Sequence, residues 1–178
     1  MTIAQYIKIV LIGDGTVGKT AIRNKFINQP FDPDYLMTIG SDFTVAEINI
    51  ENVGQVMLQI WDLAGQPHFN VVRSLYYQGA AGALIVYDVI NPISFQNIPN
   101  WLAELEKNAG SVPFSLVGNK IDLRDQAESA ITREEGMNLC EQLTQEGKKV
   151  FLRETSALTG EGIHEIFVDL TKIILDSL

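Results

Sequence analysis

The sequence has few of the features that direct a chain into a membrane or out of the cell. Cys140 is the only cysteine among its 178 residues, so no intramolecular disulfide can form and we expect a reducing, cytoplasmic compartment. The longest apolar run, residues 80–87, is interrupted by Gly82 and is far shorter than the roughly 20 residues that cross a bilayer. The first residues also lack the basic segment and long apolar stretch of a signal peptide. We therefore expect no direct insertion into a membrane.

Lipidation signals and an excess of positive charge are missing too. Thr2 excludes N-myristoylation, and residues 175–178 offer no cysteine for prenylation, so membrane association stays uncertain. Lysine and arginine number 13 against 22 aspartates and glutamates, which gives a net charge of −9. Such a surface repels phosphate backbones, so we expect no nucleic-acid partner. Any phosphate that the protein binds must be held by a local site.

The hydrophobic content of 46% is enough to bury the core of one domain, and we expect a single monomeric domain over residues 1–178. Between Ser41 and Trp61 there is no room for a helix, and a turn at residues 52–54 predicts a β-hairpin. Elsewhere β-branched apolar runs alternate with stretches long enough for helices. This alternation predicts an α/β fold with a mainly parallel sheet and one antiparallel edge strand. The runs are residues 6–12, 56–61, 83–87, 113–117 and 149–152.

Three segments carry apolar residues at the three- and four-residue steps of a helix, and we expect all three stripes to face the core. Thr132 and Glu135 match a capping box that starts the second of these helices. Cys140 belongs to that stripe, so a buried small hydrophobe is expected there rather than a nucleophile. The stripes are Ile98, Trp101, Leu102 and Leu105; Met137, Cys140 and Leu143; and Ile163, Ile166, Phe167, Leu170, Ile173 and Ile174.

A glycine-rich segment follows the first predicted strand and opens the first predicted helix. Glycines there let successive backbone N–H groups point into one concavity, and the helix N-terminus adds positive potential, which together suit phosphate oxygens. Lys19 would reach the β and γ phosphates, and the Thr20 hydroxyl would bind Mg²⁺. Alone, the pattern indicates only a nucleoside triphosphate site, and an ordinary glycine-rich turn is the alternative. The segment is Gly13, Asp14, Gly15, Thr16, Val17, Gly18, Lys19 and Thr20.

Two further segments fit phosphate hydrolysis and its sensing. Asp62 follows a predicted strand and would support Mg²⁺ through water, Gly65 would bring a backbone N–H to the γ-phosphate, and Gln66 would orient a water for in-line attack. Thr38 would bind Mg²⁺ through its hydroxyl and the γ-phosphate through its N–H. Taken singly, a solvated loop carboxylate and an ordinary loop threonine are the alternatives. In the functional interpretation, loss of the γ-phosphate releases Thr38 and Gly65 and relaxes both loops.

A third group of residues fits recognition of a guanine base. The Asp122 carboxylate would accept from the N1–H and the 2-amino group of guanine, a pair of donors that adenine does not offer in that place. Asn119 would tie this loop to the glycine-rich segment, and the stem of Lys120 would cover one face of the base. In residues 154–157 the Ala157 N–H would donate to the guanine 6-oxo group, although this segment alone reads as a loop. Phe31 is a candidate edge contact for the base, with a core or loop aromatic as an equal alternative.

The order and placement of these segments resemble those of the Ras superfamily of small GTPases over essentially the full chain. Within it the sequence looks most like Rab proteins, on the strength of TIGSDF at 38–43, LQIWDLAGQ at 58–66 and YYQGA at 76–80. VYDV at 86–89, Ser94-Phe95 and Trp101-Leu102 extend the match. The resemblance implies a three-layer P-loop NTPase fold, with a six-stranded, mostly parallel sheet, one antiparallel edge strand and helices on both faces.

The resemblance also implies a function, a set of partners and a site. The function is a switch that binds GTP or GDP with Mg²⁺ and hydrolyses GTP slowly, controlled by effector, exchange-factor and GAP proteins, with membrane trafficking as the Rab setting. Catalysis would rest on Gln66, Lys19 and Thr38, and the metal on Thr20, Thr38 and Asp62. Effectors would read an aromatic surface of Phe43, Trp61 and Tyr76. The nucleotide contacts would be residues 13–20 with Ala21, Phe31, Tyr35, Thr38, Gly65, Asn119, Lys120, Asp122, Ser156, Ala157 and Leu158.

The sequence departs from the Rab pattern at three positions beside the proposed catalytic residue. Leu63 stands where threonine is usual, and Pro67-His68 replaces glutamate and arginine, which bears on regulator recognition more than on nucleotide binding. His68 and His164 have no partners at metal-ligand spacing and receive no role.

Two alternative functions are weighed against the switch. A P-loop kinase or ATPase is disfavoured by Asn119 and Asp122. A domain that binds GTP without hydrolysing it remains the alternative function.

Overall fold

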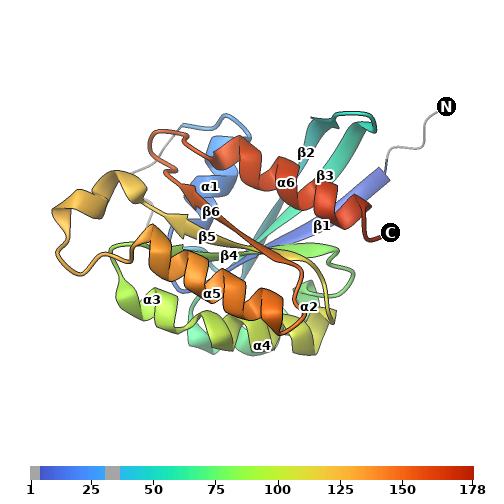
Figure 1. Ribbon diagram of the computed structural model, residues 1–178. Helices are drawn as coiled ribbons and strands as arrows, with labels where there is room; N and C mark the ends of the chain where they lie inside the picture. The colour runs from blue at the N-terminus through green and yellow to red at the C-terminus, as the bar shows by residue number, and fades with distance from the viewer. Residues whose placement is uncertain (1–4, 31–36) are drawn as a thin grey trace.

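The computed structural model describes residues 5–30 and 37–178, which form one six-stranded sheet flanked by helices (Figure 1). The strand order is β2-β3-β1-β4-β5-β6, and among the described strands only β2 and β3 pair antiparallel. This arrangement confirms the predicted mostly parallel sheet with one antiparallel edge strand. The strands are β1 (Gln5–Ile12), β2 (Ser41–Ile50), β3 (Gly54–Leu63), β4 (Gly82–Asp88), β5 (Phe114–Asn119) and β6 (Val150–Thr155).

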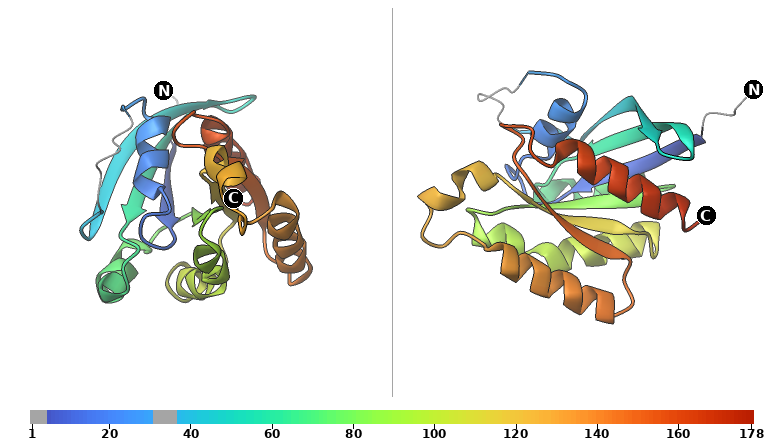
Figure 2. Two further views of the ribbon diagram at one scale, coloured as in Figure 1. Left: turned by 90° about the vertical axis from the view of Figure 1, so that its left-hand side faces the viewer. Right: turned by 45° about the horizontal axis from the view of Figure 1, so that its top comes forward.

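Helices cover both faces of the sheet and give three layers. In Figures 1 and 2, α1 and α6 lie on one face, and α2, α3, α4 and α5 lie on the other. Each face has its own apolar core: Phe167 of α6 is central to one, and Trp101 of α4 and Cys140 of α5 belong to the other. The helices are α1 (Lys19–Phe26), α2 (Asn70–Tyr76), α3 (Pro92–Gln96), α4 (Ile98–Ala109), α5 (Arg133–Gln145) and α6 (Ile163–Leu175), with short 3₁₀ helices η1 (Pro67–Phe69) and η2 (Ile121–Gln126).

The hairpin between β2 and β3 forms where the sequence predicted it. Asn52 and Gly54 adopt positive φ angles of 65° and 101°, and the Val53 N–H donates to the Ile50 carbonyl at 3.0 Å. Glycine and asparagine tolerate this left-handed backbone better than other residues, so the turn falls on them. The hairpin places β2 at the edge of the sheet.

Several strands extend further than the sequence predicted. Asp62 and Leu63 belong to β3, Asn119 belongs to β5, and Glu154 and Thr155 belong to β6. The sequence pattern missed them because polar side chains interrupt the apolar runs there, whereas the ladder of backbone hydrogen bonds continues. The polar residues therefore sit on rigid strand ends instead of in loops.

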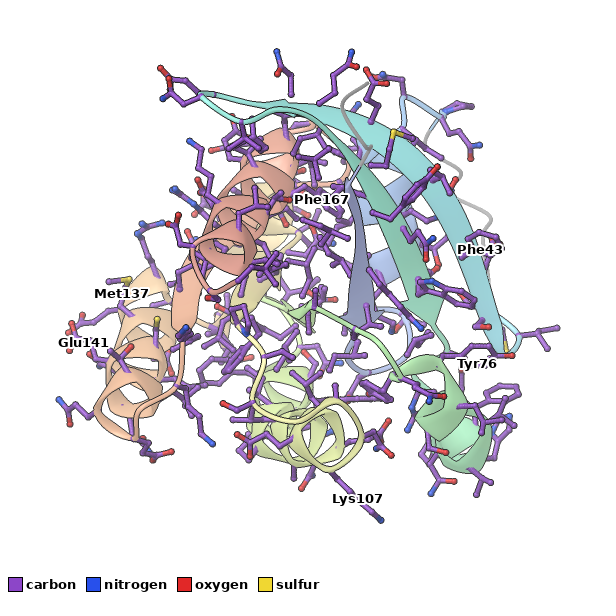
Figure 3. The ribbon with its side chains drawn as sticks, turned by 90° about the vertical axis from the view of Figure 1, so that its right-hand side faces the viewer. Phe43, Tyr76, Lys107, Met137, Glu141 and Phe167 are labelled. Carbon is purple, nitrogen blue, oxygen red and sulfur yellow. The ribbon has the colours of Figure 1, made fainter. Side chains whose placement is uncertain are left out.

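In α5 one residue of the predicted apolar stripe does not face the core. Its capping box between Thr132 and Glu135 is confirmed, and Cys140 and Leu143 are buried as expected. Met137, however, is 38% exposed and points away from the body of the molecule (Figure 3). Gly136 takes the buried place instead, because a Cβ there would lie 2.8 Å from the Tyr87 hydroxyl.

Candidate functional site

The glycine-rich segment joins the end of β1 to the start of α1, at the edge where the parallel strands end (Figure 2, left). Gly18 has a φ of +103°, and a Cβ there would lie 2.3 Å from the Asn119 amide nitrogen, so glycine is required. The Lys19 ammonium donates to the carbonyls of Gly13 at 2.8 Å and Asp14 at 2.7 Å. The lysine therefore folds back over its own loop, beside the helix N-terminus that favours anions.

Lys19 is one of the most deeply buried charged groups in the described part of the chain. Burial lowers its pKa to about 8, while the nearby Asp62 and Asp14 carboxylates act in the opposite direction. A group with this pKa gains strongly from an anion placed beside it. Phosphate oxygens are such an anion.

Two hydroxyls and a carboxylate meet beside Lys19. The Thr20 hydroxyl donates to the Asp62 carboxylate and lies 2.9 Å from the Thr38 hydroxyl, which lies 3.4 Å from the same carboxylate oxygen. Burial raises the pKa of Asp62, against the effect of the Thr20 hydrogen bond and of Lys19. The other Asp62 oxygen, Oδ1, is buried and has no hydrogen-bond partner within residues 5–30 and 37–178.

This cluster suits a hard divalent cation. Mg²⁺ prefers oxygen ligands and is usually bound by one or two protein groups together with waters and phosphate. A buried carboxylate oxygen without a partner is the group that such an ion or its water would satisfy. In the described part of the chain no three histidine, cysteine, aspartate or glutamate side chains form a metal cluster. The groups available to a metal here are the two hydroxyls and the Asp62 carboxylate.

The segment after β3 lies against the glycine-rich loop. A Cβ on Gly65 would lie 2.4 Å from the Gly13 carbonyl oxygen and 2.5 Å from the Gly15 nitrogen, so only glycine allows this approach. A Cβ on Gly15 would in turn lie 3.6 Å from the amide nitrogen of Gln66. The Gln66 side-chain oxygen is buried and makes no hydrogen bond to any described residue. An amide placed in this way can accept a hydrogen bond from a water.

Asn119, at the end of β5, ties this part of the chain to the glycine-rich loop, as predicted. Its amide nitrogen donates to the Val17 carbonyl at 3.0 Å, and its oxygen accepts from the Thr155 hydroxyl at 3.0 Å. Lys120 adds a second tie, because its ammonium donates to the Thr16 carbonyl at 2.8 Å and pairs with Asp88 at 2.7 Å. Four chain segments, which contain Val17, Asp88, Asn119 and Thr155, are thereby held together at one edge of the sheet.

The half-buried Asp122 carboxylate accepts from the Ser156 hydroxyl at 2.6 Å, which brings η2 and the loop after β6 together. The Ala157 N–H, predicted to donate to guanine, donates here to the Asn119 side-chain oxygen at 3.2 Å. Donation to a base would share or replace that bond. Leu158, beside it, is exposed, and Ala21 is packed against the core from α1.

Some sequence-based expectations concern other parts of the chain. Phe31 and Tyr35 lie outside the described residues. His68 and His164 are both exposed; the His164 ring stacks on Phe26, and the His68 ring is tilted against Phe69.

The three aromatic residues of the expected effector surface lie in a row over β2, β3 and α2. The Phe43 and Trp61 rings stack at 4.8 Å between centroids, and the Trp61 and Tyr76 rings lie 5.4 Å apart. Figure 3 shows Phe43 and Tyr76 along the same side of the molecule. Phe43 is exposed, and Trp61 and Tyr76 are half-buried. The row is a preformed apolar contact surface.

A set of polar contacts behind residues 64–66 was not predicted from the sequence. Arg73 of α2 donates to the carbonyls of Ala64 and Gln66, and the Asp14 carboxylate accepts from Asn97 and from the Trp101 indole N–H. No sequence motif marks these contacts: Asp14 is 83 and 87 residues from its two partners, and Arg73, only 7 and 9 residues from its partners, interrupts the apolar pattern that would mark a buried position.

Comparisons with known proteins agree with this geometry. A sequence model of the Ras family matches residues 8–176. The chain is 39% identical to the Ras-related protein RABE1e of Arabidopsis thaliana over 173 residues, which cover 97% of this chain and 76% of the relative. It is 39% identical to the Ras-related protein Rab-4 of Dictyostelium discoideum over 173 residues, 97% of this chain and 80% of the relative. The Ras-related protein Rab-13 of Canis lupus familiaris is 37% identical over 169 residues, 94% of this chain and 79% of the relative.

The family model and the identities of 37–39% over nearly the whole chain extend well beyond the short motifs. The six-stranded mixed sheet with helices on both faces is consistent with the fold of this family. The chain therefore belongs to the Ras family, as a Rab-like small GTPase that binds guanine nucleotides and acts as a switch.

Proposed function

We propose that residues 1–178 act as one monomeric G domain whose nucleotide lies across the edge formed by the glycine-rich loop and the loops after β5 and β6. The observation that carries this proposal is the pair of ties from Asn119 to Val17 and from Lys120 to Thr16. They hold the phosphate-binding and base-reading segments in one fixed relation, although the segments are 102 and 104 residues apart. A nucleotide spanning both would be bound at its phosphates and its base at once.

The phosphates would be held by Lys19 and by the backbone N–H groups of residues 13–20, with Ala21 in the first turn of α1 beside them. A bound triphosphate would replace the carbonyl contacts of Lys19 with stronger, charge-assisted ones. Thr20, Thr38 and Asp62 would hold Mg²⁺, directly through the two hydroxyls and through water at the carboxylate. The bound ion would neutralise part of the charge on the phosphates.

Hydrolysis would depend on Gln66, assisted by Lys19 and Thr38. The Gln66 amide would orient a water for attack on the γ-phosphorus, in line with the bond to the β-phosphate oxygen. Gly65 and Thr38 would contact the γ-phosphate through their N–H groups. The Ala64 N–H already donates to the Gly40 carbonyl at 2.9 Å, so the two loops that sense the γ-phosphate are joined. Loss of that phosphate would release both together.

The base would be selected by Asp122 and bounded by Lys120, Ser156, Ala157 and Leu158. An adenine placed there would leave the Asp122 carboxylate without the two donors that guanine presents, at the cost of an unpaired, partly buried charge. Phe31 and Tyr35 remain proposed contacts by resemblance.

Regulatory partners would bind at the segments around Thr38 and Gln66. The row of Phe43, Trp61 and Tyr76 is the surface we propose for effectors, with exchange factors and GAPs acting on the adjoining loops. Pro67 and His68 give these loops a composition of their own, so we expect partners selected for this chain. Membrane trafficking is the setting that the Rab relatives suggest. Among the described residues no helix has both the length and the apolar content to cross a bilayer.

The proposal is tested by identifying the nucleotide that copurifies and by measuring its release and hydrolysis. We expect GDP or GTP, faster release when Mg²⁺ is chelated, and slow GTP hydrolysis. Gln66→Leu is expected to slow single-turnover hydrolysis by about 10- to 100-fold, because the attacking water loses its orientation. Gln78→Leu, at an exposed glutamine, is the matched control. Copurified ATP, or equal hydrolysis rates for Gln66→Leu and the wild type, would contradict the proposal.

A further inference from the structure

Arg73 is a charged residue in the place where a helix usually buries an apolar one. It is 3% exposed, and within α2, all of which the structure describes, it is the one buried residue. Its apolar neighbours Val71 and Leu75 are 76% and 72% exposed. The buried attachment of α2 to the protein therefore depends on a guanidinium group, which needs hydrogen-bond partners to be tolerated there.

The first set of partners lies in the catalytic segment. Nη1 of Arg73 donates to the Ala64 carbonyl at 2.8 Å and to the Gln66 carbonyl at 2.9 Å. These two carbonyls lie on either side of Gly65, so one planar group holds both ends of a flexible stretch of backbone. The Gln66 carbonyl also accepts from the Phe69 N–H at 3.1 Å, which starts η1.

The second set of partners lies on α4. Nε and Nη2 of Arg73 donate to the two carboxylate oxygens of Glu104, at 2.7 and 2.9 Å, in a bidentate pair. The Tyr77 hydroxyl donates to the same carboxylate at 2.9 Å, and burial raises the pKa of Tyr77, so it remains a donor. A bidentate pair of this kind fixes the plane of the guanidinium as well as its position.

The same helix holds the phosphate loop. The guanidinium of Arg73 lies 4.6 Å from the centre of the Trp101 ring, and the Trp101 indole N–H donates to the Asp14 carboxylate at 2.7 Å. Asn97, just before α4, donates to the other Asp14 oxygen at 2.7 Å. Asn97 and Trp101 therefore hold the Asp14 carboxylate, and Trp101 and Glu104 of the same helix hold the Arg73 guanidinium.

We propose that Arg73 is a positioning residue for GTP hydrolysis, which fixes the backbone of Gln66 relative to the phosphate loop by way of Glu104 and Trp101. The inference rests on the role proposed above for Gln66. When the backbone of Gln66 is held, its Cα is fixed beside Gly15. The side-chain amide then orients the attacking water in the same place each time. Without Arg73 the stretch 64–69 samples other conformations, and a displacement of about 1 Å is enough to slow a positioned reaction strongly.

A structural role alone and a positioning role give different kinetics. Both would lower thermal stability when Arg73 is truncated, but only positioning acts through Gln66. The effect of Arg73→Ala on hydrolysis must then disappear in a Gln66→Leu background, because the group being positioned is already gone. Nucleotide binding must be largely retained, because Lys19, Asn119 and Asp122 make no hydrogen bond to Arg73.

The test measures single-turnover GTP hydrolysis in five proteins: wild type, Arg73→Ala, Gln66→Leu, the double variant and Arg153→Ala. We expect Arg73→Ala to be about 10- to 100-fold slower than the wild type with near-normal GDP affinity. We expect the double variant to match Gln66→Leu. Arg153→Ala, which removes an exposed pair with Asp169, is the matched control and should hydrolyse normally.

Two further variants and one structural readout complete the design. Arg73→Lys should recover part of the rate because an ammonium still donates to carbonyls, and Glu104→Gln should lose part of it, which tests the pair if Arg73→Ala fails to fold. Hydrogen exchange at the Phe69 amide should be faster in Arg73→Ala. A wild-type rate for Arg73→Ala, or for Glu104→Gln if only that variant folds, overturns the inference, as does an equal slowing with and without Gln66. If Gln66→Leu itself hydrolyses normally, the proposed function fails first, and the inference falls with it.

Discussion

Lys19 illustrates how burial changes what one side chain can do. Its ammonium donates to two backbone carbonyls, and burial lowers its pKa to about 8 although the Asp62 and Asp14 carboxylates act in the opposite direction. Nucleotide phosphates would favour the charged form and raise that pKa. Protein with nucleotide would then keep a proton that protein without nucleotide loses above about pH 8, so binding takes up a proton in this range.

We therefore expect guanine-nucleotide affinity to fall as the pH rises from 8 to 9, by up to about tenfold per pH unit. Well below pH 8 Lys19 is mostly charged with or without nucleotide, so its contribution should vary little with pH there. Calorimetry in two buffers of different ionisation enthalpy measures the proton uptake directly. Proton release on binding, or an affinity that rises above pH 8, would show that Lys19 does not carry this charge.

The helices differ in how they are attached, and from this difference we predict which of them move. Phe167 and its neighbours on α6 fill an apolar core, whereas the one fully buried residue of α2 is Arg73, with the half-buried Tyr76 packed against the core at the end of the helix. Apolar packing is hard to rearrange in part, but a set of hydrogen bonds can be exchanged for others. We expect α2 and the stretch before it to move with the nucleotide, and α5 and α6 to stay.

The capping box of α5 provides a test of that separation. Thr132 accepts from the Glu135 N–H at 3.2 Å, and Glu135 accepts from the Thr132 N–H at 2.8 Å. Thr132→Ala should lower the free energy of unfolding by about 1 kcal/mol, measured by urea denaturation, because a helix N-terminal donor loses its partner. GTP hydrolysis should be unchanged. A slower rate in this variant would mean that α5 is coupled to the site.

Motifs in the sequence predicted most of the fold and much of the candidate site, for a physical reason. Strand ends and the loops after them are local, so the residues around Lys19, Gln66 and Asn119 could be placed from spacing alone. Contacts such as Trp101 to Asp14, 87 residues apart, depend on how helices lie on the sheet, and no local pattern encodes that. The exposure of Met137 has the same origin, because the rotation of α5 is set by its tight packing at Gly136.

The whole molecule brings charges together that its overall acidity would not suggest. A protein with a net charge of −9 gathers Lys19, Lys120 and a helix N-terminus at one edge of its sheet. Local geometry therefore overrides the average field for a bound phosphate. The same edge places Asp122 against Ser156, so in the proposed site a carboxylate would read the base at the far end of the basic segment that would hold the phosphates.

The proposed role of Asp122 is tested most directly by a substitution that should change which base the protein prefers. Xanthine carries an oxygen where guanine carries the 2-amino group, so an asparagine at position 122 would donate to xanthine and lose its charge-assisted bonds to guanine. The base preference is measured by competition binding of GTP, XTP and ATP to the wild type, Asp122→Asn and Asp125→Asn. Asp125 is an exposed aspartate of the same η2 and serves as the control. We predict a preference for GTP in the wild type and in Asp125→Asn, and a preference for XTP in Asp122→Asn. An unchanged preference for GTP in Asp122→Asn would contradict the account.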